Sequence, residues 1–176
     1  MRLAGDPLPD TKAMIRVDHA GEYGAARIYA GQLAVMGNRS SVSGEITRMA
    51  AQEEKHLVTF DRLIRERRVR PTLLMPLWHG AGFALGALSA LAGPKAAMAV
   101  TAAVETEIDR HYQEQRDQLQ GDDPELESLI TEFQAEEQEH KKIAIAHGAE
   151  QAVAYPLMSA VIRAGCRAAI KLSEKI

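Results

Sequence analysis

The chain has 176 residues and a formal net charge of −3, and 46% of its residues are apolar. This length and composition exclude a disordered chain, and we expect one domain over residues 1–176. Because there is no basic excess, nucleic acid is not an expected partner. The single cysteine, Cys166, excludes an internal disulfide and indicates a reducing compartment. The first sixteen residues contain no long apolar run, so we expect no secretory signal.

Helical periodicity dominates the first part of the chain. Apolar side chains recur at steps of three and four over residues 11–36, which predicts a helix that Gly37 and Asn38 end. A second helix is expected from Ser43 to about Arg68. Its inward stripe alternates these steps like a heptad seam and consists of Ile46, Met49, Glu53, His56, Phe60 and Leu63.

An apolar segment, residues 71–94, follows without Lys, Arg, Asp or Glu. Its prolines and glycines leave a helical core of about fourteen residues over 81–94, roughly 21 Å at 1.5 Å per residue. That length is short of a ~30 Å hydrocarbon layer, so we expect a crossover helix and not a membrane span.

Three more helices are predicted in the second half of the chain. The first covers residues 94–119, and the second follows the turn at residues 121–124 with a stripe of Leu126, Ile130, Phe133, Glu137, His140 and Ala144. The last, residues 157–173, has basic residues at four-residue intervals beside apolar ones. The predicted fold is all-α, a ferritin-like four-helix bundle with a long apolar crossover helix and an additional C-terminal amphipathic helix.

A pattern of potential metal ligands occurs twice. In each half a lone Glu precedes a Glu-x-x-His motif, by 31 residues in the first half and by 32 in the second. The six residues are Glu22, Glu53, His56, Glu105, Glu137 and His140. Glu-x-x-His members replace apolar residues in both helix stripes, which indicates that they face the core and not the solvent. The repeat predicts two similar helix pairs that bring all six together.

Buried carboxylates need cations, because an ionised carboxylate without a partner is very costly to bury. Two divalent ions would balance four carboxylates, and this ligand set favours iron or manganese over zinc, with iron preferred if oxygen is used. We expect Glu22 and His56 on one metal, Glu105 and His140 on the other, and Glu53 and Glu137 bridging. The alternative is that these residues are exposed charges on polar helix faces.

Several other polar residues lie near the expected ligands. Asp18, one turn before Glu22, is a candidate for orienting a ligand His, and His111 is a candidate hydrogen-bond partner. Tyr29 and Tyr112 each follow a lone Glu by seven residues. They could take part in radical chemistry, but we favour core tyrosines whose hydroxyls hydrogen-bond near the site.

The chain resembles the demethoxyubiquinone hydroxylases of ubiquinone biosynthesis. Four stretches carry the resemblance: IRVDHAGEYGAARIYAGQ, VRPTLLMPLWHGAGFALGALSALAG, AVETEIDRHY and AGCRAAIKLSEK. The resemblance places the family's iron ligands on the six residues that the spacing selects. It implies two Fe ions per chain and O2 as co-substrate, and it implies that the ring of a polyprenylated demethoxyubiquinol is hydroxylated. Electrons would come from the quinol, a reductase or NADH.

The same resemblance implies a lipid setting. Five arginines over residues 62–70, Trp78 and the basic last helix favour the membrane surface as a partner. We expect a peripheral location on the cytoplasmic face of a bacterial cell membrane, or on the matrix side of the mitochondrial inner membrane in a eukaryote. A lipid-presenting protein of the pathway is a further expected partner. The alternative is that the crossover helix and the last helix only cover the bundle, and that their charges are simply solvated.

Three rival functions share parts of these features. A ferroxidase or iron-storage bundle, or a di-iron peroxidase or manganese catalase, would have the ligands but no use for an apolar crossover. A non-enzymatic scaffold would bind no metal.

Overall fold

The fold was analysed in a computed structural model that describes residues 8–176. This part of the chain contains six α-helices, one short 3-10 helix and no strand. The elements are α1 (Thr11–Met36), α2 (Ser43–Glu66), α3 (Met75–Leu91), α4 (Pro94–Leu119), α5 (Pro124–Ala146), η1 (Ala149–Gln151) and α6 (Tyr155–Lys175). The all-α prediction is confirmed. Of the sixteen residues that the expectation about a secretory signal concerns, residues 1–7 lie outside the described residues.

Local sequence signals set several helix ends. The Asp10 side chain accepts a hydrogen bond from the Ala13 amide at the start of α1, and the Asp123 side chain accepts one from the Leu126 amide at the start of α5. Gly37 ends α1 with a φ of 52°, a left-handed conformation that suits glycine. The predicted bounds of α1 and α4 are therefore confirmed.

The predicted start of the crossover helix was wrong. α3 begins at Met75 and not at residue 81. Pro76 lies in its first turn, where a proline costs little because its missing amide hydrogen would have no partner within the helix. Pro76 and the glycines of this segment therefore do not shorten the helix to the predicted core.

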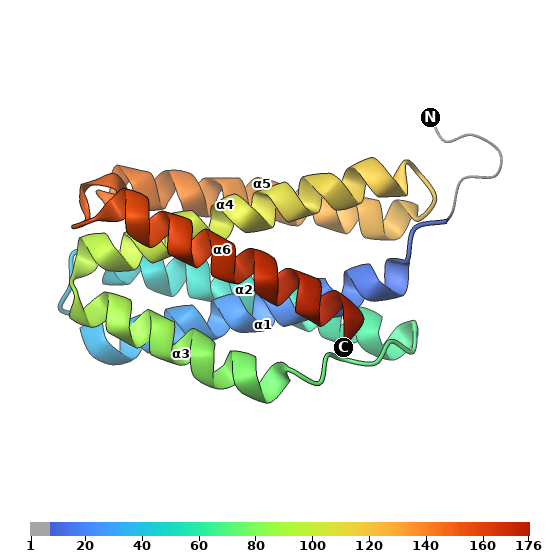
Figure 1. Cartoon of the computed structure of the whole chain (residues 1–176), viewed down its shortest axis with the longest axis horizontal. Coiled ribbons are helices and arrows are strands. Elements are labelled where there is room, and N and C mark those ends of the chain that lie inside the picture. The colour runs from blue at the N-terminus through green and yellow to red at the C-terminus, as the bar shows by residue number, and fades with distance from the viewer. Residues whose placement is uncertain (1–7) are drawn as a thin grey trace.

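Two antiparallel helix pairs form the body of the molecule. α1 lies beside α2, and α4 lies beside α5, while α3 packs along α1 and α6 crosses α4 and α1 (Figure 1). Two large apolar clusters and a smaller one around Ile28 and Val104 fill the interior. One large cluster contains Met49 and Met98, and the other contains Phe60 and Leu126. The helical bundle agrees with the predicted class, and its assignment as ferritin-like stays a prediction.

α3 is seated on α1 by direct backbone contact. A Cβ atom at Gly86 would lie 1.9 Å from the carbonyl oxygen of Ile28, and one at Gly31 would lie 2.2 Å from that of Phe83. Both distances are far below van der Waals contact, so a side chain at either position would push the helices apart. Within residues 8–176, no helix has the length and apolar character needed to cross a membrane.

α6 is held in a different way. Ser173 is its only fully buried residue. Polar contacts attach its middle turns to α4, where the Glu107 carboxylate accepts hydrogen bonds from Arg163 Nε at 2.6 Å and Arg167 Nη1 at 2.8 Å. The Glu107 side chain is fully buried, and Arg110 also lies 2.8 Å from it. α6 is thus fastened to α4 by ion pairs, and partly buried apolar side chains such as Met158 and Ile162 pack against the core.

Candidate metal centre

The six predicted ligands meet in the centre of the bundle. Each is at most 2% exposed, and they come from α1, α2, α4 and α5. Their ligand atoms form two groups, and the atoms within each group lie within 4.8 Å of one another. The groups are Glu22, Glu53, His56 and Glu137, and Glu53, Glu105, Glu137 and His140. Glu53 and Glu137 belong to both, which is the arrangement that bridging ligands require.

Both histidines direct Nδ1 into the cluster. His56 Nδ1 lies 3.3 Å from Glu22 Oε2 and 3.2 Å from Glu137 Oε1. His140 Nδ1 lies 3.1 Å from Glu137 Oε2 and 3.2 Å from Glu53 Oε1. The i, i+3 spacing produces this geometry, because residues one helical turn apart share a face. Each imidazole can therefore donate a nitrogen lone pair to the same ion as its neighbouring carboxylates.

The donor set fits a bound cation. Both carboxylate oxygens of Glu53 and Oε2 of Glu105 are buried and accept no hydrogen bond from a donor among residues 8–176. Buried acceptors without donors are rare in folded proteins because each costs the desolvation of a polar group. A divalent ion would supply the missing positive partner, and oxygen-rich ligation with one imidazole per ion suits iron or manganese.

The shifted pKa values of the cluster residues show that several negative charges lie close together. Burial, and then the charge of Glu137, raises the pKa of the Glu53 carboxyl well above its usual value. Burial, and again the charge of Glu137, raises the pKa of the Glu105 carboxyl in the same direction. Burial lowers the pKa of His56, but hydrogen bonds to Glu137 and Glu22 outweigh it and raise the pKa to about 11. Without metal, protons must therefore take the place of cations in the cluster.

The two symmetrically placed tyrosines are buried hydrogen-bond donors. Tyr29 donates its hydroxyl hydrogen to Glu105 Oε1 at 2.9 Å, and Tyr112 donates to Glu22 Oε1. Each tyrosine thus reaches from its own half of the repeat to the lone Glu of the other half. Burial, and then the nearby carboxylates, raises the pKa of both phenols well above the usual value. The favoured interpretation of the tyrosine pair is confirmed.

Asp18 does not orient a ligand histidine, contrary to expectation. Its Oδ1 atom accepts a hydrogen bond from Gln115 Nε2 at 2.8 Å and lies 3.3 Å from His111 Nε2. Asp18 points toward α4 and not toward α2 or α5, where the ligand histidines are. His111 is thus next to Asp18 and Gln115 and not next to a ligand.

The carboxylate at the outward nitrogen of a ligand histidine is that of Glu136, which the sequence did not single out. Its Oε2 atom lies 2.8 Å from His56 Nε2, and Gln52 Oε1 lies 3.1 Å from His140 Nε2. A signal was present, because Gln52 and Glu136 each come directly before the Glu of a Glu-x-x-His motif. Their partners are on the opposite helix, however, and sequence spacing does not show that pairing.

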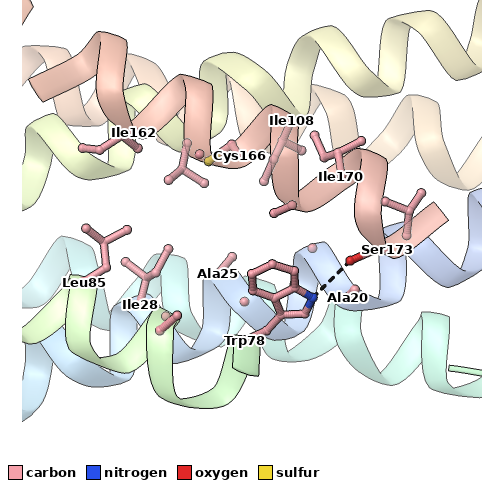
Figure 2. Close-up of a pocket in the computed structure, with 18 of the residues that line it drawn as sticks. Ala20, Ala25, Ile28, Trp78, Leu85, Ile108, Ile162, Cys166, Ile170 and Ser173 are labelled. Atoms are coloured by element: carbon pink, nitrogen blue, oxygen red, sulfur yellow. Dashed lines mark hydrogen bonds between the residues drawn. The ribbon is translucent and has the colours of Figure 1, made fainter. Parts of the chain in front are cut away.

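An apolar cavity of about 370 Å³ lies beside the cluster, between α1, α3, α4 and α6. Figure 2 shows Leu85 and Ile28 on one side of the cavity and Ile162 and Cys166 on the other. At one end Trp78 Nε1 donates a hydrogen bond to Ser173 Oγ at 3.0 Å, which links α3 with α6. The lining also includes residues next to two ligands, namely Gly21 beside Glu22 and Val104 beside Glu105. The cavity thus lies on the same two inner helices, α1 and α4, as Glu22 and Glu105, although no ligand side chain is part of its lining.

Comparisons with known proteins give a consistent answer. Residues 9–173 match the family described as ubiquinone biosynthesis protein COQ7. The 3-demethoxyubiquinol 3-hydroxylase of Rhodospirillum rubrum is 55% identical over 99% of this chain and 84% of its own length. The human mitochondrial NADPH-dependent 3-demethoxyubiquinone 3-hydroxylase is 54% identical over 93% of this chain and 76% of its own. The Saccharomyces cerevisiae 5-demethoxyubiquinone hydroxylase is 42% identical over 93% and 77%.

Proposed function

Because the chain belongs to the COQ7 family of ubiquinone biosynthesis proteins, we propose that it hydroxylates the ring of a polyprenylated demethoxyubiquinol with O2 as a di-iron monooxygenase. The observation that carries this proposal is the position of the buried cluster of carboxylates and histidines against an apolar cavity. The cluster accounts for an oxygen-activating metal centre. The cavity accounts for a substrate with a hydrocarbon tail.

The six cluster residues would hold two iron ions. Glu22 and His56 would bind one ion, Glu105 and His140 the other, and Glu53 and Glu137 would bridge them, as the two overlapping ligand groups suggest. When bound, iron supplies the redox chemistry that activates O2 for attack on an electron-rich ring.

The surrounding side chains prepare the site. The hydroxyls of Tyr29 and Tyr112 donate to Glu105 and Glu22, which fixes the direction of these two carboxylates. Burial of the cluster excludes bulk water and strengthens every electrostatic contact inside it.

The cavity would bind the substrate by its apolar parts. Its wall is built from small and aliphatic side chains of four helices, so an isoprenoid chain could replace water there at a gain of roughly 25 cal/mol per Å² of apolar surface. Small residues of α1, among them Gly21, Gly24 and Ala25, line the part near Glu22. They leave room for a ring to approach the metal ligands.

Hydroxylation with O2 needs two electrons per turnover, which the quinol itself or an external reductant could supply. Several relatives are named NADPH-dependent, and we propose a reduced nicotinamide nucleotide, NADH or NADPH, as the donor. A lipid-presenting protein of the pathway remains a proposed partner, because the substrate is poorly soluble in water.

We also propose a peripheral position on a membrane, on the cytoplasmic face in a bacterium or the matrix side of the inner membrane in a mitochondrion. Support comes from exposed apolar residues on the two outer helices, including Leu77 and Leu88 on α3 and Leu157 and Val161 on α6. The basic residues support it less than the sequence suggested. Arg67 pairs with Asp123 and Glu125, and two of the basic residues of α6 pair with Glu107.

Metal analysis and product analysis together test the proposal. We expect two irons per purified chain, and a product heavier by one oxygen atom when the reduced protein receives demethoxyubiquinol and O2. Iron oxidation without ring hydroxylation would support the ferroxidase alternative. A chain that binds far less than two irons would refute the metal centre itself.

A further inference from the structure

The outward nitrogens of the two ligand histidines are joined by a continuous chain of hydrogen bonds. His56 Nε2 lies 2.8 Å from Glu136 Oε2, and His140 Nε2 lies 3.1 Å from Gln52 Oε1. Gln52 Nε2 closes the chain by donating to the same Glu136 oxygen at 3.2 Å. The chain runs across the face between α2 and α5, away from the apolar cavity, and the Glu136 side chain is 35% exposed there.

The chemistry of the chain fixes the direction of every bond. An ionised carboxylate can only accept, so both His56 Nε2 and the Gln52 amide nitrogen must donate to Glu136. The Gln52 amide is then oriented with its oxygen toward His140, which therefore also donates from Nε2. With their hydrogens held on Nε2, both imidazoles present Nδ1 to the carboxylate cluster.

The two ligand histidines differ in the group that accepts the hydrogen bond from Nε2. His56 donates to a carboxylate, whereas His140 donates to a neutral amide. A hydrogen bond to a carboxylate makes an imidazole a stronger ligand than a hydrogen bond to a neutral group. The polar groups at the two ions otherwise match, because each half has one lone Glu, one His, one tyrosine hydroxyl on the lone Glu, and the two shared glutamates, although the His56 ring stacks on Phe133 and the His140 ring lies edge-on to Tyr29.

We propose that Glu136 and Gln52 are positioning residues that fix both ligand histidines and make the two metal sites unequal. The site of His56, backed by Glu136, binds a divalent ion more tightly than the site of His140, backed by Gln52. The inference rests on the proposed function only in requiring that the cluster bind two ions.

A reciprocal exchange of the two residues tests the inference without measuring activity. Co(II) serves as the probe, because its visible spectrum reports ligation and its anomalous scattering locates it in crystals. With one equivalent of Co(II), we expect the wild-type protein to fill the His56 site first. Glu136→Gln places an amide behind both histidines, so it should weaken the tighter site about 10- to 100-fold and leave the second ion within a few-fold of wild type.

The double variant Gln52→Glu with Glu136→Gln exchanges the two residues, so the carboxylate then lies behind His140 Nε2 and the amide behind His56 Nε2. We expect the first Co(II) to move to the His140 site in this variant. Glu139→Gln, an exposed change on the same helix that contacts Lys142 and not the site, should leave both affinities unchanged. These variants keep the buried ligands intact, and circular dichroism would confirm that each one folds.

The outcomes separate the inference from the proposed function. If Glu136→Gln weakens both ions equally, or if the double variant still fills the His56 site first, the inequality is wrong while the metal centre stands. If wild-type protein binds no Co(II) and no iron, the proposed function fails together with the inference.

Discussion

The two sides of the metal cluster differ in chemistry. On the side of α3 and α6 there is an apolar cavity, and Trp78 and Ser173 join the two helices by a hydrogen bond at its end. On the side of α2 and α5 there is a chain of polar groups that ends at the half-exposed Glu136. A hydrocarbon tail can enter only where it meets apolar surface, and protons can pass only where polar groups line up.

An apolar side and a polar side around one cluster would allow a small bundle to accept the proposed lipid substrate and polar reactants at the same metal centre. The ligands lie between the two sides, so the substrate ring and the proton-carrying groups can reach the cluster without competing for the same space. The walls of the cavity also differ from each other. α3 is fixed by backbone contact at Gly86, whereas α6 combines the ion pairs of Glu107 with partly buried apolar side chains such as Ile162.

The largest effect is expected from removing a ligand that both groups share. Glu53 belongs to both clusters, so Glu53→Ala should lose most of the bound iron and abolish hydroxylation. Loss of ligand charge at a buried metal site cannot be replaced by water alone. Iron content by plasma mass spectrometry and product formation by mass spectrometry measure the two effects.

The adjacent residue provides the control for this variant. Glu54 is exposed on the same helix, so Glu54→Ala should retain two irons per chain and full hydroxylation. If Glu53→Ala kept both irons, the bridging assignment would be wrong.

A smaller effect on hydroxylation is expected from a side chain that fills part of the apolar cavity and leaves the metal ligands unchanged. Gly165 lines the cavity on α6, and a Cβ atom there meets nothing within 4 Å, so a leucine can be placed at this edge of the cavity without displacing a neighbour, and we expect it to narrow the cavity. We expect the KM for a long-tailed substrate to rise about tenfold or more, as for an overfilled site. A substrate with a truncated tail should be affected less, and the iron content should not change.

Gly44 serves as the matched position, because it is exposed in α2, has free space around it and does not line the cavity. Gly44→Leu should leave both KM values near wild type. Equal rises for long-tailed and short-tailed substrates in Gly165→Leu would argue that the tail does not lie in this cavity.

Much of the centre could be predicted from sequence because its signal is periodic. Helix spacing shows which residues share a face, and a Glu or His in an apolar stripe stands out, as Glu53 and His140 do. The bounds of α1 and α4 followed from the same periodicity and from strong end signals such as Gly37. These features depend on residues close together in the chain.

Features that depend on contacts between helices could not be predicted. Glu136 contacts a histidine 80 residues away, and only the packing of α2 against α5 reveals it. Arg163 and Arg167 suggested a charged outer face, but they converge on Glu107, which has no periodic signal of its own. α3 extends past its expected start because Pro76 costs little in the first turn and because His79 contacts the Tyr23 hydroxyl of α1.

The pH dependence of stability tests the charge of the cluster. The carboxyls of Glu53 and Glu105 have raised pKa values, mainly because of burial, so the metal-free folded state binds more protons than the unfolded state. Their contribution to the free energy of unfolding therefore falls as the pH rises above 4.5, the usual pKa of a glutamate carboxyl. The contribution of His56 is complete below its usual pKa of 6.5 and is lost as pH approaches about 11.

We therefore expect the free energy of unfolding of the metal-free protein to be lower at about pH 9 than at about pH 6, by at least the ~1.4 kcal/mol of one pKa unit. Iron or Co(II) should reverse the trend, because metal binds the deprotonated ligands. Urea unfolding at both pH values measures it. Metal-free protein that gained stability toward alkaline pH would contradict this account of the cluster.

The smallest effect is expected at the attachment of α6. Glu107→Gln removes the charge that binds Arg163 and Arg167 but leaves these half-exposed arginines free to be solvated. α6 should then leave the bundle more often, while α3 stays in place. Hydrogen exchange of the α6 backbone amides reports this opening, and we expect the exchange rate to rise severalfold, up to about tenfold. Glu125→Gln, which weakens an arginine pair far from α6, should leave the rate unchanged. An unchanged rate in Glu107→Gln would show that apolar contacts hold α6 as firmly as backbone contact holds α3, and the two walls of the cavity would then be equivalent.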